Sequence, residues 1–172
     1  STLGKIIVKG PDAAEFLNRV YTNKWMKLAV GRCRYGLMLG EDGMIMDDGV
    51  SSRLGEDEFL MTTTTGGAAG VLNHLEDYLQ TEWTDLRVYL TSVTEQWAVA
   101  SLNGPRARDL LAELCPDADL SPEGFKCMSW QDATVAGIKA RIFRISFTGD
   151  LAFEINVPAD QGMALWSRLM NA

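Results

Sequence analysis

Residues 35–48 read Tyr35-Gly-Leu-Met-Leu-Gly-Glu-Asp-Gly-Met-Ile-Met-Asp-Asp48, and this stretch predicts a strand, a tight turn and a second strand. From Cys33 to Leu39, every second residue is Cys, Tyr or Leu, which is the period of a strand with one face more buried than the other. The dipeptide Asp42-Gly43 predicts the turn, because glycine accepts a positive φ at no steric cost.

Two carboxylates end the second strand. Met44 to Met46 is apolar enough to lie in a core, and Asp47 and Asp48 follow at once. A carboxylate at the end of a buried strand costs free energy unless a partner or a ligand uses it. Strand alternation places the two acids on opposite faces, so we expect one of them to point inward. Both a structural role, in a turn, cap or ion pair, and a functional role stay open on this pattern.

Composition sets limits on the function. The chain has 172 residues, 47% hydrophobic and 23% charged, with a net charge of −7 that argues against a nucleic-acid surface. We see no apolar run long enough to span a membrane and no signal peptide. Cys33, Cys115 and Cys127 lack metal-ligand spacing, and His74 is the single histidine, so we expect reduced thiols, no metal site and a cytoplasmic protein.

The chain repeats itself at a fixed offset. Gly10-Pro11 and Gly104-Pro105 lie 94 residues apart, and each predicts a helix start with proline at the first helical position. The same offset pairs Ala13 with Ala107, Leu17 with Leu111, Gly43 with Gly137, Phe59 with Phe153 and Leu75 with Leu169. We therefore predict an α+β domain of two β-α-β-β-β-α halves, at about 1–80 and 95–172, with mainly antiparallel sheets and a pseudo-twofold relation.

Further elements follow from local patterns. We expect a possible strand over 86–90 in the connector, and strands over 125–130, 134–137 and 139–147 in the second half. The last helix is predicted to turn a stripe of Met163, Trp166, Leu169 and Met170 inward. The start in a strand without Met and the end without a capping glycine favour a piece of a longer polypeptide.

Glu154 is the third acid of interest. It follows Phe153 on the last strand, and alternation places it on the face away from Phe153 and Ile155, which is either solvent or a cleft. In a cleft, its carboxylate could bind a heterocycle with adjacent N–H donors. Asp48 on the matching strand of the first half could then be the second acid of the same cleft, a pair suited to proton transfer.

Other residues carry weaker signals. Tyr35 is either a core aromatic or a stacking platform, and the threonines from Thr62 to Thr65 form either a plain strand or a row of ligand hydroxyls. Gly66-Gly67 before a helix could seat an anion, although the remaining P-loop spacing is absent. No Rossmann glycine fingerprint opens a strand–helix unit, so flavin or nicotinamide binding is not expected on this chain.

Three segments resemble one protein family. Gly31-Arg-Cys-Arg-Tyr-Gly-Leu-Met-Leu-Gly-Glu-Asp-Gly-Met-Ile-Met-Asp-Asp48 resembles the G-x-x-x-Y-x-x-x-L-x-x-x-G-x-x-x-D-D signature of the glycine-cleavage T-protein (aminomethyltransferase) family. Asn103-Gly-Pro-Arg-Ala107 and Phe147-Thr-Gly-Asp-Leu-Ala-Phe-Glu-Ile155 resemble its G-P-x-A and Y-T-G-E-x-G-x-E-I segments. Within the family, the chain looks most like the branch found in the α subunits of heterotetrameric sarcosine oxidases.

The resemblance implies folate-dependent one-carbon chemistry. The family binds tetrahydrofolate and combines a one-carbon unit at the formaldehyde level with its N5 and N10 to give 5,10-methylenetetrahydrofolate. Carried over, Asp48, favoured over Asp47, is the catalytic acid that manages protons near these nitrogens, and Glu154 hydrogen-bonds the pteridine ring. The sarcosine oxidase branch further implies other subunits as partners, and flavin and NAD bound elsewhere in the complex.

The resemblance also implies pocket residues and shows departures. Tyr35, Thr63 and Phe147 would line the folate pocket, with Asp47 beside them. Phe147 stands where the family usually has Tyr, Thr63 stands near a usual Asn, and Gly49 follows the acids where Leu is common. These losses keep an alternative open, in which the chain is a non-catalytic module that docks subunits or shapes a channel for formaldehyde.

Overall fold

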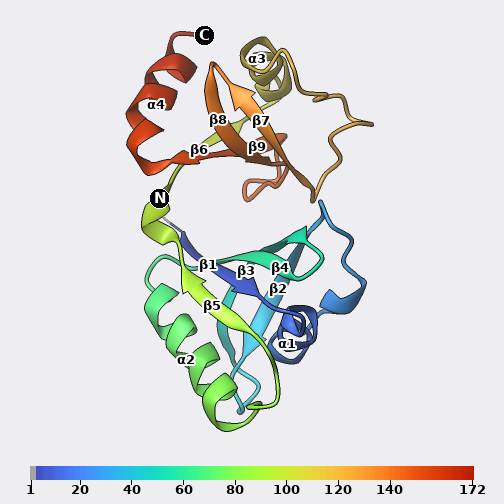
Figure 1. Ribbon diagram of the computed structural model, residues 1–172. Helices are drawn as coiled ribbons and strands as arrows, with labels where there is room; N and C mark the ends of the chain where they lie inside the picture. Colours follow the sequence, from blue (N-terminus) through green and yellow to red (C-terminus); the bar gives the residue numbers. More distant parts are fainter. Residues whose placement is uncertain (1–2) are drawn as a thin grey trace. The chain divides into compact units, whose positions relative to one another are not determined.

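The computed structural model describes residues 3–172, and these divide into two units of mixed helix and strand (Figure 1). The first unit ends at Thr94 and the second is Glu95–Ala172, so each is described by itself. The predicted connector after residue 80 belongs to the first unit.

The first unit is an antiparallel sheet with helices on one face. Its elements are β1 (Gly4–Lys9), α1 (Ala13–Val20), a 3-10 turn (Trp25–Lys27), β2 (Cys33–Leu39), β3 (Ile45–Gly55), β4 (Glu58–Thr63), α2 (Ala68–Thr81) and β5 (Tyr89–Ser92). The strand order is β2-β3-β4-β1-β5. The strand expected over 86–90 is β5, which begins slightly later and pairs with β1.

Alternation along the strands decides what the helices cover. Phe59 and Met61 of β4 are fully buried against α1 and α2, where Phe16, Leu17 and Leu75 complete the core. A buried aromatic or aliphatic side chain of this size contributes about 1.5–3 kcal/mol through burial alone. Every second residue of these strands therefore lies on the other side of the sheet, called here the helix-free face.

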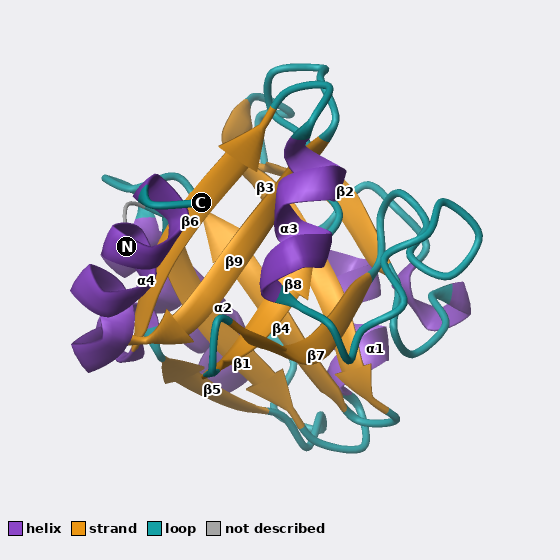
Figure 2. Ribbon diagram, turned by 90° about the horizontal axis from the view of Figure 1, so that it is seen from above, coloured by secondary structure: helices purple, strands orange, loops and turns teal. Residues whose placement is uncertain are grey.

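The second unit repeats this plan. Its elements are a 3-10 turn (Thr94–Gln96), β6 (Trp97–Asn103), α3 (Ala107–Leu114), β7 (Trp130–Val135), β8 (Ile138–Phe143), β9 (Ala152–Pro158), a second 3-10 turn (Ala159–Gln161) and α4 (Gly162–Met170). The antiparallel order is β6-β9-β8-β7. Helices α3 and α4 lie on one face of this sheet (Figure 2), where Leu111 and Leu165 pack on Phe153 and Ile155.

The two units share their topology. The predicted β-α-β-β-β-α order is confirmed in each, and β7-β8-β9-β6 repeats the neighbour order of β2-β3-β4-β1. Val8 pairs with Phe59, and 94 residues later Leu102 pairs with Phe153. The mixed α and β class with antiparallel sheets is thus confirmed, while the pseudo-twofold relation between the halves stays a prediction.

The turns that start α1 and α3 also match. Gly10 has a φ of +138° and Gly104 a φ of +120°, conformations that favour glycine. The Gly10 amide donates to the Asp57 carbonyl at 2.9 Å, and the Gly104 amide donates to the Leu151 carbonyl at 2.9 Å. The repeated Gly-Pro motif therefore marks one turn that occurs twice.

The middle hairpins differ in register. Met61 lies opposite Ser51, whereas Ile155, its counterpart 94 residues later, lies opposite Ile142, which follows Ser51 by only 91 residues. A slip by an odd number of residues exchanges the two faces of a strand. Side chains of β8 therefore face the side opposite to that expected from the 94-residue offset.

Two expectations for the second half were wrong. Most of the strand expected over 125–130 is absent: Phe125 is buried as part of a loop, and β7 begins only at Trp130. In α4, the inward residue is Leu165, while Met163, Trp166 and Met170 are exposed. A helix of this length presents one apolar stripe to its sheet, and Leu165 and Leu169, four residues apart, occupy that stripe.

No helix in residues 3–172 has the length and apolarity to cross a membrane.

Candidate functional site

Asp47 is buried and fully engaged by its neighbours. It lies on the helix-covered face of β3 and is 3% exposed. The Thr64 hydroxyl donates to its Oδ1 at 2.6 Å, and the Thr64 amide donates to the same oxygen at 3.2 Å. Charge-assisted bonds of this kind compensate the cost of burying a carboxylate. Asp47 therefore ties the end of β4 to β3.

The start of α2 leaves room for this carboxylate. Gly67 is the N-cap residue, and a Cβ there would lie 2.6 Å from Thr64 Oγ1 and 3.1 Å from Asp47 Oδ1. Glycine thus allows the carboxylate to approach the helix N-terminus, where a negative charge is favoured. This arrangement explains Gly67 without an external anion.

Asp48 points the other way, as alternation predicts. It lies on the helix-free face and is only partly buried. The Tyr35 hydroxyl, on the neighbouring strand β2, donates to Asp48 Oδ2 at 2.7 Å. This hydrogen bond is the main reason that the pKa of Tyr35 lies above its usual value. Tyr35 is itself 48% exposed, so the pair is reachable from outside the unit.

The glycine at position 49, where the family commonly has Leu, is explained by the contacts between β3 and β4. A Cβ on Gly49 would lie 2.0 Å from the Thr62 carbonyl oxygen. Beside it, the Val50 amide donates to Thr62 Oγ1 at 3.0 Å, and that hydroxyl donates to the Val50 carbonyl at 3.1 Å. The two strands are joined here by a side chain as well as by backbone, so Gly49 permits the close approach directly after Asp48.

Thr63 lies apart from the Tyr35–Asp48 pair. It is 1% exposed on the helix-covered face, and its hydroxyl donates to the Thr64 carbonyl at 2.9 Å. Strand alternation is the cause, because neighbouring residues of β4 face opposite sides. Thr62, which lies on the helix-free face, is the threonine on the same side as Asp48.

Tyr21 is a neighbour of the acids that sequence reasoning missed. Its hydroxyl is buried next to the buried hydroxyl of Ser51. Burial, and secondly the charge of Asp47, raise the pKa of Tyr21 far above its usual value. The sequence places Tyr21 directly after a predicted helix and gives no sign of its neighbours. Its position beside the acids follows from its bridge to Met38 of β2, which only the structure shows.

In the second unit, Glu154 lies where alternation predicted. Its neighbours on β9, Phe153 and Ile155, are fully buried on the helix-covered face, and Glu154 is partly exposed on the opposite face. It pairs with Ser101 on β6 and with Phe143 on β8. The helix-free face of this sheet thus carries Glu154 near its centre.

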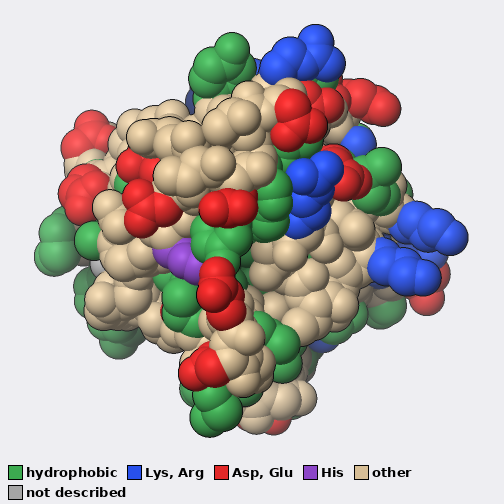
Figure 3. Space-filling model, turned by 90° about the horizontal axis from the view of Figure 1, so that it is seen from below, with side chains coloured by type: hydrophobic (Ala, Val, Ile, Leu, Met, Phe, Trp, Pro, Cys, Tyr) green, Lys and Arg blue, Asp and Glu red, His purple; other side chains and the backbone are tan. Residues whose placement is uncertain are grey.

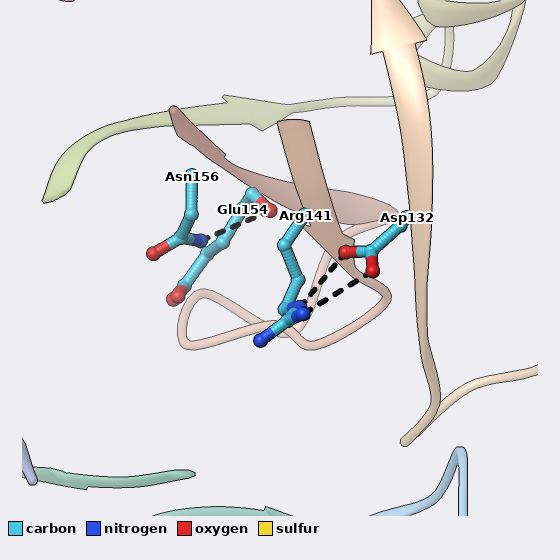
Figure 4. A network of polar contacts seen from close by, with 4 residues as sticks. All are labelled: Asp132, Arg141, Glu154 and Asn156. Carbon is cyan, nitrogen blue, oxygen red and sulfur yellow. Dashed lines mark hydrogen bonds and ion pairs between the residues drawn. The ribbon is translucent and has the colours of Figure 1, made fainter. Parts of the chain in front are cut away.

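A polar network surrounds Glu154 (Figure 4). Arg141 donates to both carboxylate oxygens of Asp132, from Nε at 2.9 Å and from Nη2 at 3.2 Å. The Asn156 side chain, 3% exposed, donates to the Glu154 backbone carbonyl at 3.5 Å. All four side chains belong to β7, β8 and β9. They combine acceptor and donor groups on one surface.

Phe147 lies in the loop between β8 and β9 and is fully exposed. The structure therefore brings together Tyr35 and Asp48 in the first unit, with Asp47 and Thr63 on the other face of the same sheet. Glu154 and Phe147 belong to the second unit. The cleft shared by Asp48 and Glu154 stays a prediction.

Acidic and basic side chains are distributed differently on the surface. Figure 3 shows acidic side chains spread over one face of the molecule and around the single histidine, with the basic side chains in small groups. Among residues 3–172, no cluster of three or more His, Cys, Asp or Glu side chains has the arrangement of a metal site. The site residues named above offer carboxylates, hydroxyls and a guanidinium.

Comparison with known proteins gives a consistent result. The family model described as GCVT N-terminal domain matches residues 1–172. The sarcosine oxidase subunit alpha of Corynebacterium sp. (strain P-1) is 59% identical over 167 residues, which are 96% of this chain and 17% of that protein. The aminomethyltransferase of Thermotoga sp. (strain RQ2) is 30% identical over 171 residues, or 99% of this chain and 45% of that protein.

A solved structure agrees with these relatives. The glycine cleavage system aminomethyltransferase T from Bartonella henselae matches with a TM-score of 0.82 and 27% identity, over 99% of this chain and 44% of that one. The chain thus has the fold of one part of that structure. It spans about a sixth of the length of the α subunit and less than half of the aminomethyltransferases.

Proposed function

The chain belongs to the GCVT N-terminal domain family, and from that membership we propose that it is the tetrahydrofolate-binding segment of a sarcosine oxidase α subunit. Sarcosine demethylation by the whole enzyme would release a one-carbon unit at the formaldehyde level. The segment would combine this unit with tetrahydrofolate to give 5,10-methylenetetrahydrofolate. Flavin and NAD would be bound elsewhere in the complex, which would include other subunits as partners.

The different surroundings of Asp47 and Asp48 are the observation that supports this proposal most. Asp47 is buried and accepts two hydrogen bonds from Thr64, so its structural role is sufficient to explain it. Asp48 is partly exposed and receives one hydrogen bond from Tyr35, so carboxylate lone pairs remain for a ligand. A partly exposed carboxylate beside a tyrosine is better placed for proton transfer than for stabilising the folded chain.

The residues present fit the proposed ligand. Tetrahydrofolate would supply N5 and N10, which bind the one-carbon unit with loss of one water. Asp48 could accept a proton from a nitrogen and return it to the departing oxygen. The hydrogen bond from Tyr35 would hold the carboxylate in one orientation during this exchange. Tyr35 also offers an exposed ring on which a planar group can stack.

Glu154 would bind the other end of the ring system. The pterin presents an amino group and a ring N–H on one edge, and a carboxylate can accept from both. Glu154 lies on the helix-free face of its sheet, next to the polar groups of Asn156 and Arg141. Phe147, exposed in the neighbouring loop, would supply an apolar contact without the hydroxyl of the usual tyrosine.

The test uses the full-length protein with its partner subunits. We expect Asp48→Asn to lower the yield of 5,10-methylenetetrahydrofolate from sarcosine and tetrahydrofolate by about a hundredfold or more, the usual effect of losing an acid–base group. Sarcosine oxidation, measured by oxygen uptake, should continue, and free formaldehyde should accumulate instead.

Asp57→Asn is the matched control. Asp57 is an exposed aspartate of the same unit in the turn between β3 and β4, and this change should leave the yield at the wild-type value. An unchanged yield from Asp48→Asn would contradict the proposed role of Asp48. If the wild-type protein also failed to bind tetrahydrofolate, the alternative of a docking or channelling module would be favoured.

A further inference from the structure

Arg141 is a cation placed beside Glu154 without any role in the core. It lies opposite Asn156 in the β8–β9 pairing, and Glu154 lies opposite Phe143, so Arg141 and Glu154 are diagonal neighbours. Diagonal side chains on one face are within reach of each other when they are long. Figure 4 shows both side chains leaving the sheet on the same side.

Three neighbours fix the Arg141 guanidinium in place. Asp132 holds it in a bidentate ion pair, with distances of 2.9 and 3.2 Å. Its Cζ atom lies 4.7 Å from the centroid of the Trp130 ring and 5.9 Å from that of Trp97. The Arg141 side chain is only 19% exposed, against 63% for Asp132. Such restraint reduces the entropy cost of a further contact.

The restraint leaves donors available. A guanidinium carries five N–H groups, and Asp132 takes two of them. No other hydrogen bond of the Arg141 side chain occurs among the described residues. An isolated ion pair on a surface contributes at most about 1 kcal/mol, so stability alone is a weak reason for this arrangement.

We propose that Arg141 determines the specificity for the pterin ring by donating a hydrogen bond to its carbonyl oxygen. This inference rests on the proposed function. The pyrimidine edge of a pterin presents an amino group, a ring N–H and a carbonyl oxygen in sequence. Glu154 offers the acceptor for the first two, and the fixed fork of Arg141 offers the donor for the third.

The proposal predicts how the site distinguishes two ligands. In the 4-amino-4-deoxy analogue of tetrahydrofolate, an amino donor replaces the carbonyl acceptor and faces the N–H groups of Arg141. The neighbouring ring nitrogen also loses the N–H that Glu154 would accept. The wild-type full-length protein should therefore bind tetrahydrofolate more tightly than the analogue. A hydrogen bond to a charged group contributes enough for a roughly tenfold to hundredfold preference. The measurement is the dissociation constant of each ligand, by calorimetry, without turnover.

Arg141→Met should reduce the ratio of the two dissociation constants by about tenfold or more, mainly by weakening tetrahydrofolate binding. Arg141→Lys keeps the charge but loses the planar fork, and it should recover only part of the ratio. Lys139→Met removes the next cation along β8 and serves as the control, for which we expect the wild-type ratio. The melting temperature of each variant verifies that it is folded.

The outcomes separate the two hypotheses. A wild-type protein that binds neither ligand would contradict the proposed function itself. Binding of tetrahydrofolate with an unchanged ratio in folded Arg141→Met or Arg141→Lys would overturn only the role of Arg141. A loss of the ratio in Lys139→Met of the same size would also overturn it, because a general effect of positive charge would then explain the preference.

Discussion

Adjacent residues of one strand can have unrelated physical roles. Asp47 and Asp48 are chemically identical, yet one accepts hydrogen bonds from Thr64 beneath the sheet and the other accepts one from Tyr35 above it. The sequence predicted that one of them points inward, because alternation requires it. It could not say which, because that choice depends on which face α1 and α2 cover.

Tyr21 gives a prediction about alkaline pH. Its folded-state pKa is raised by burial, so the neutral phenol is favoured in the fold and the unfolded chain loses its proton first, near pH 10. This contribution to stability is present below that pH and is lost as the pH rises above it. We expect Tyr21→Phe to be less sensitive than wild type by up to about 1.4 kcal/mol per pH unit.

The urea midpoint of both proteins between pH 8 and 11 measures this difference. Tyr35 and Tyr78 also have raised pKa values, through hydrogen bonds to Asp48 and Glu41, and both remain in the variant as an internal reference. At neutral pH, the variant should be about as stable as wild type, because the loss of the contact with the Ser51 hydroxyl is offset by no longer burying a polar group. If the urea midpoints of wild type and Tyr21→Phe changed with pH in the same way, the raised pKa of Tyr21 would be contradicted.

At the scale of elements, β3 and β4 approach each other so closely at Gly49 that a side chain would not fit there. We expect Gly49→Ala to destabilise the first unit by about 2 kcal/mol or more, because the new Cβ would collide with the Thr62 carbonyl between β3 and β4. Gly70→Ala is the matched control. Apart from the helix's own backbone and its chain neighbours, no described atom lies within 4 Å of its Cβ position, so alanine should stabilise by about 0.5–1 kcal/mol.

Chemical unfolding of the two glycine variants against wild type measures both effects. Equal small changes would show that the close approach at Gly49 relaxes easily. Opposite signs are expected, since one glycine is required by contact and the other occupies an open helical position.

An arginine over a core phenylalanine is a second repeated device. Arg53 lies opposite Phe59, with its Cζ 5.3 Å from the ring centroid, and Arg144 lies 5.4 Å from the centroid of Phe153. Arg53 donates to the Leu28 carbonyl at 2.8 Å, so its guanidinium also stabilises the loop that contains Leu28. The phenylalanines were paired by the sequence offset, but the arginines were not, because 91 and not 94 residues separate them.

At the scale of the whole molecule, the duplication was the most predictable feature. Gly-Pro turns and the offset of 94 residues were sufficient for the element order of both units. The pairing of β1 with β4 and of β6 with β9 came only from the structure. The inside and outside of α4 were not predictable, since Leu165, Trp166 and Met170 are all apolar and only packing selects among them. Phe125 is likewise apolar and buried, and an apolar residue alone does not distinguish a buried loop from a strand.

Thiol reactivity offers a test of the fold as a whole. Cys127 is exposed, whereas Cys33 and Cys115 are buried. Burial, and secondly the charge of Asp117, raise the pKa of Cys115 to about 11, which lowers its thiolate fraction further. We expect brief alkylation of the native full-length protein to modify Cys127 first, as measured by peptide mass spectrometry. Equal labelling of all three before unfolding would contradict this fold.

The register slip between the middle hairpins has a practical consequence for protein engineers. Grafting the acidic hairpin of the first half onto the second by the 94-residue offset would put the Asp48 carboxylate at Ile142, in the hydrophobic interior. Counting 91 residues instead would place it at Lys139, on the surface. A chimera that swaps these segments must therefore be numbered from the neighbouring strand and not from the turn.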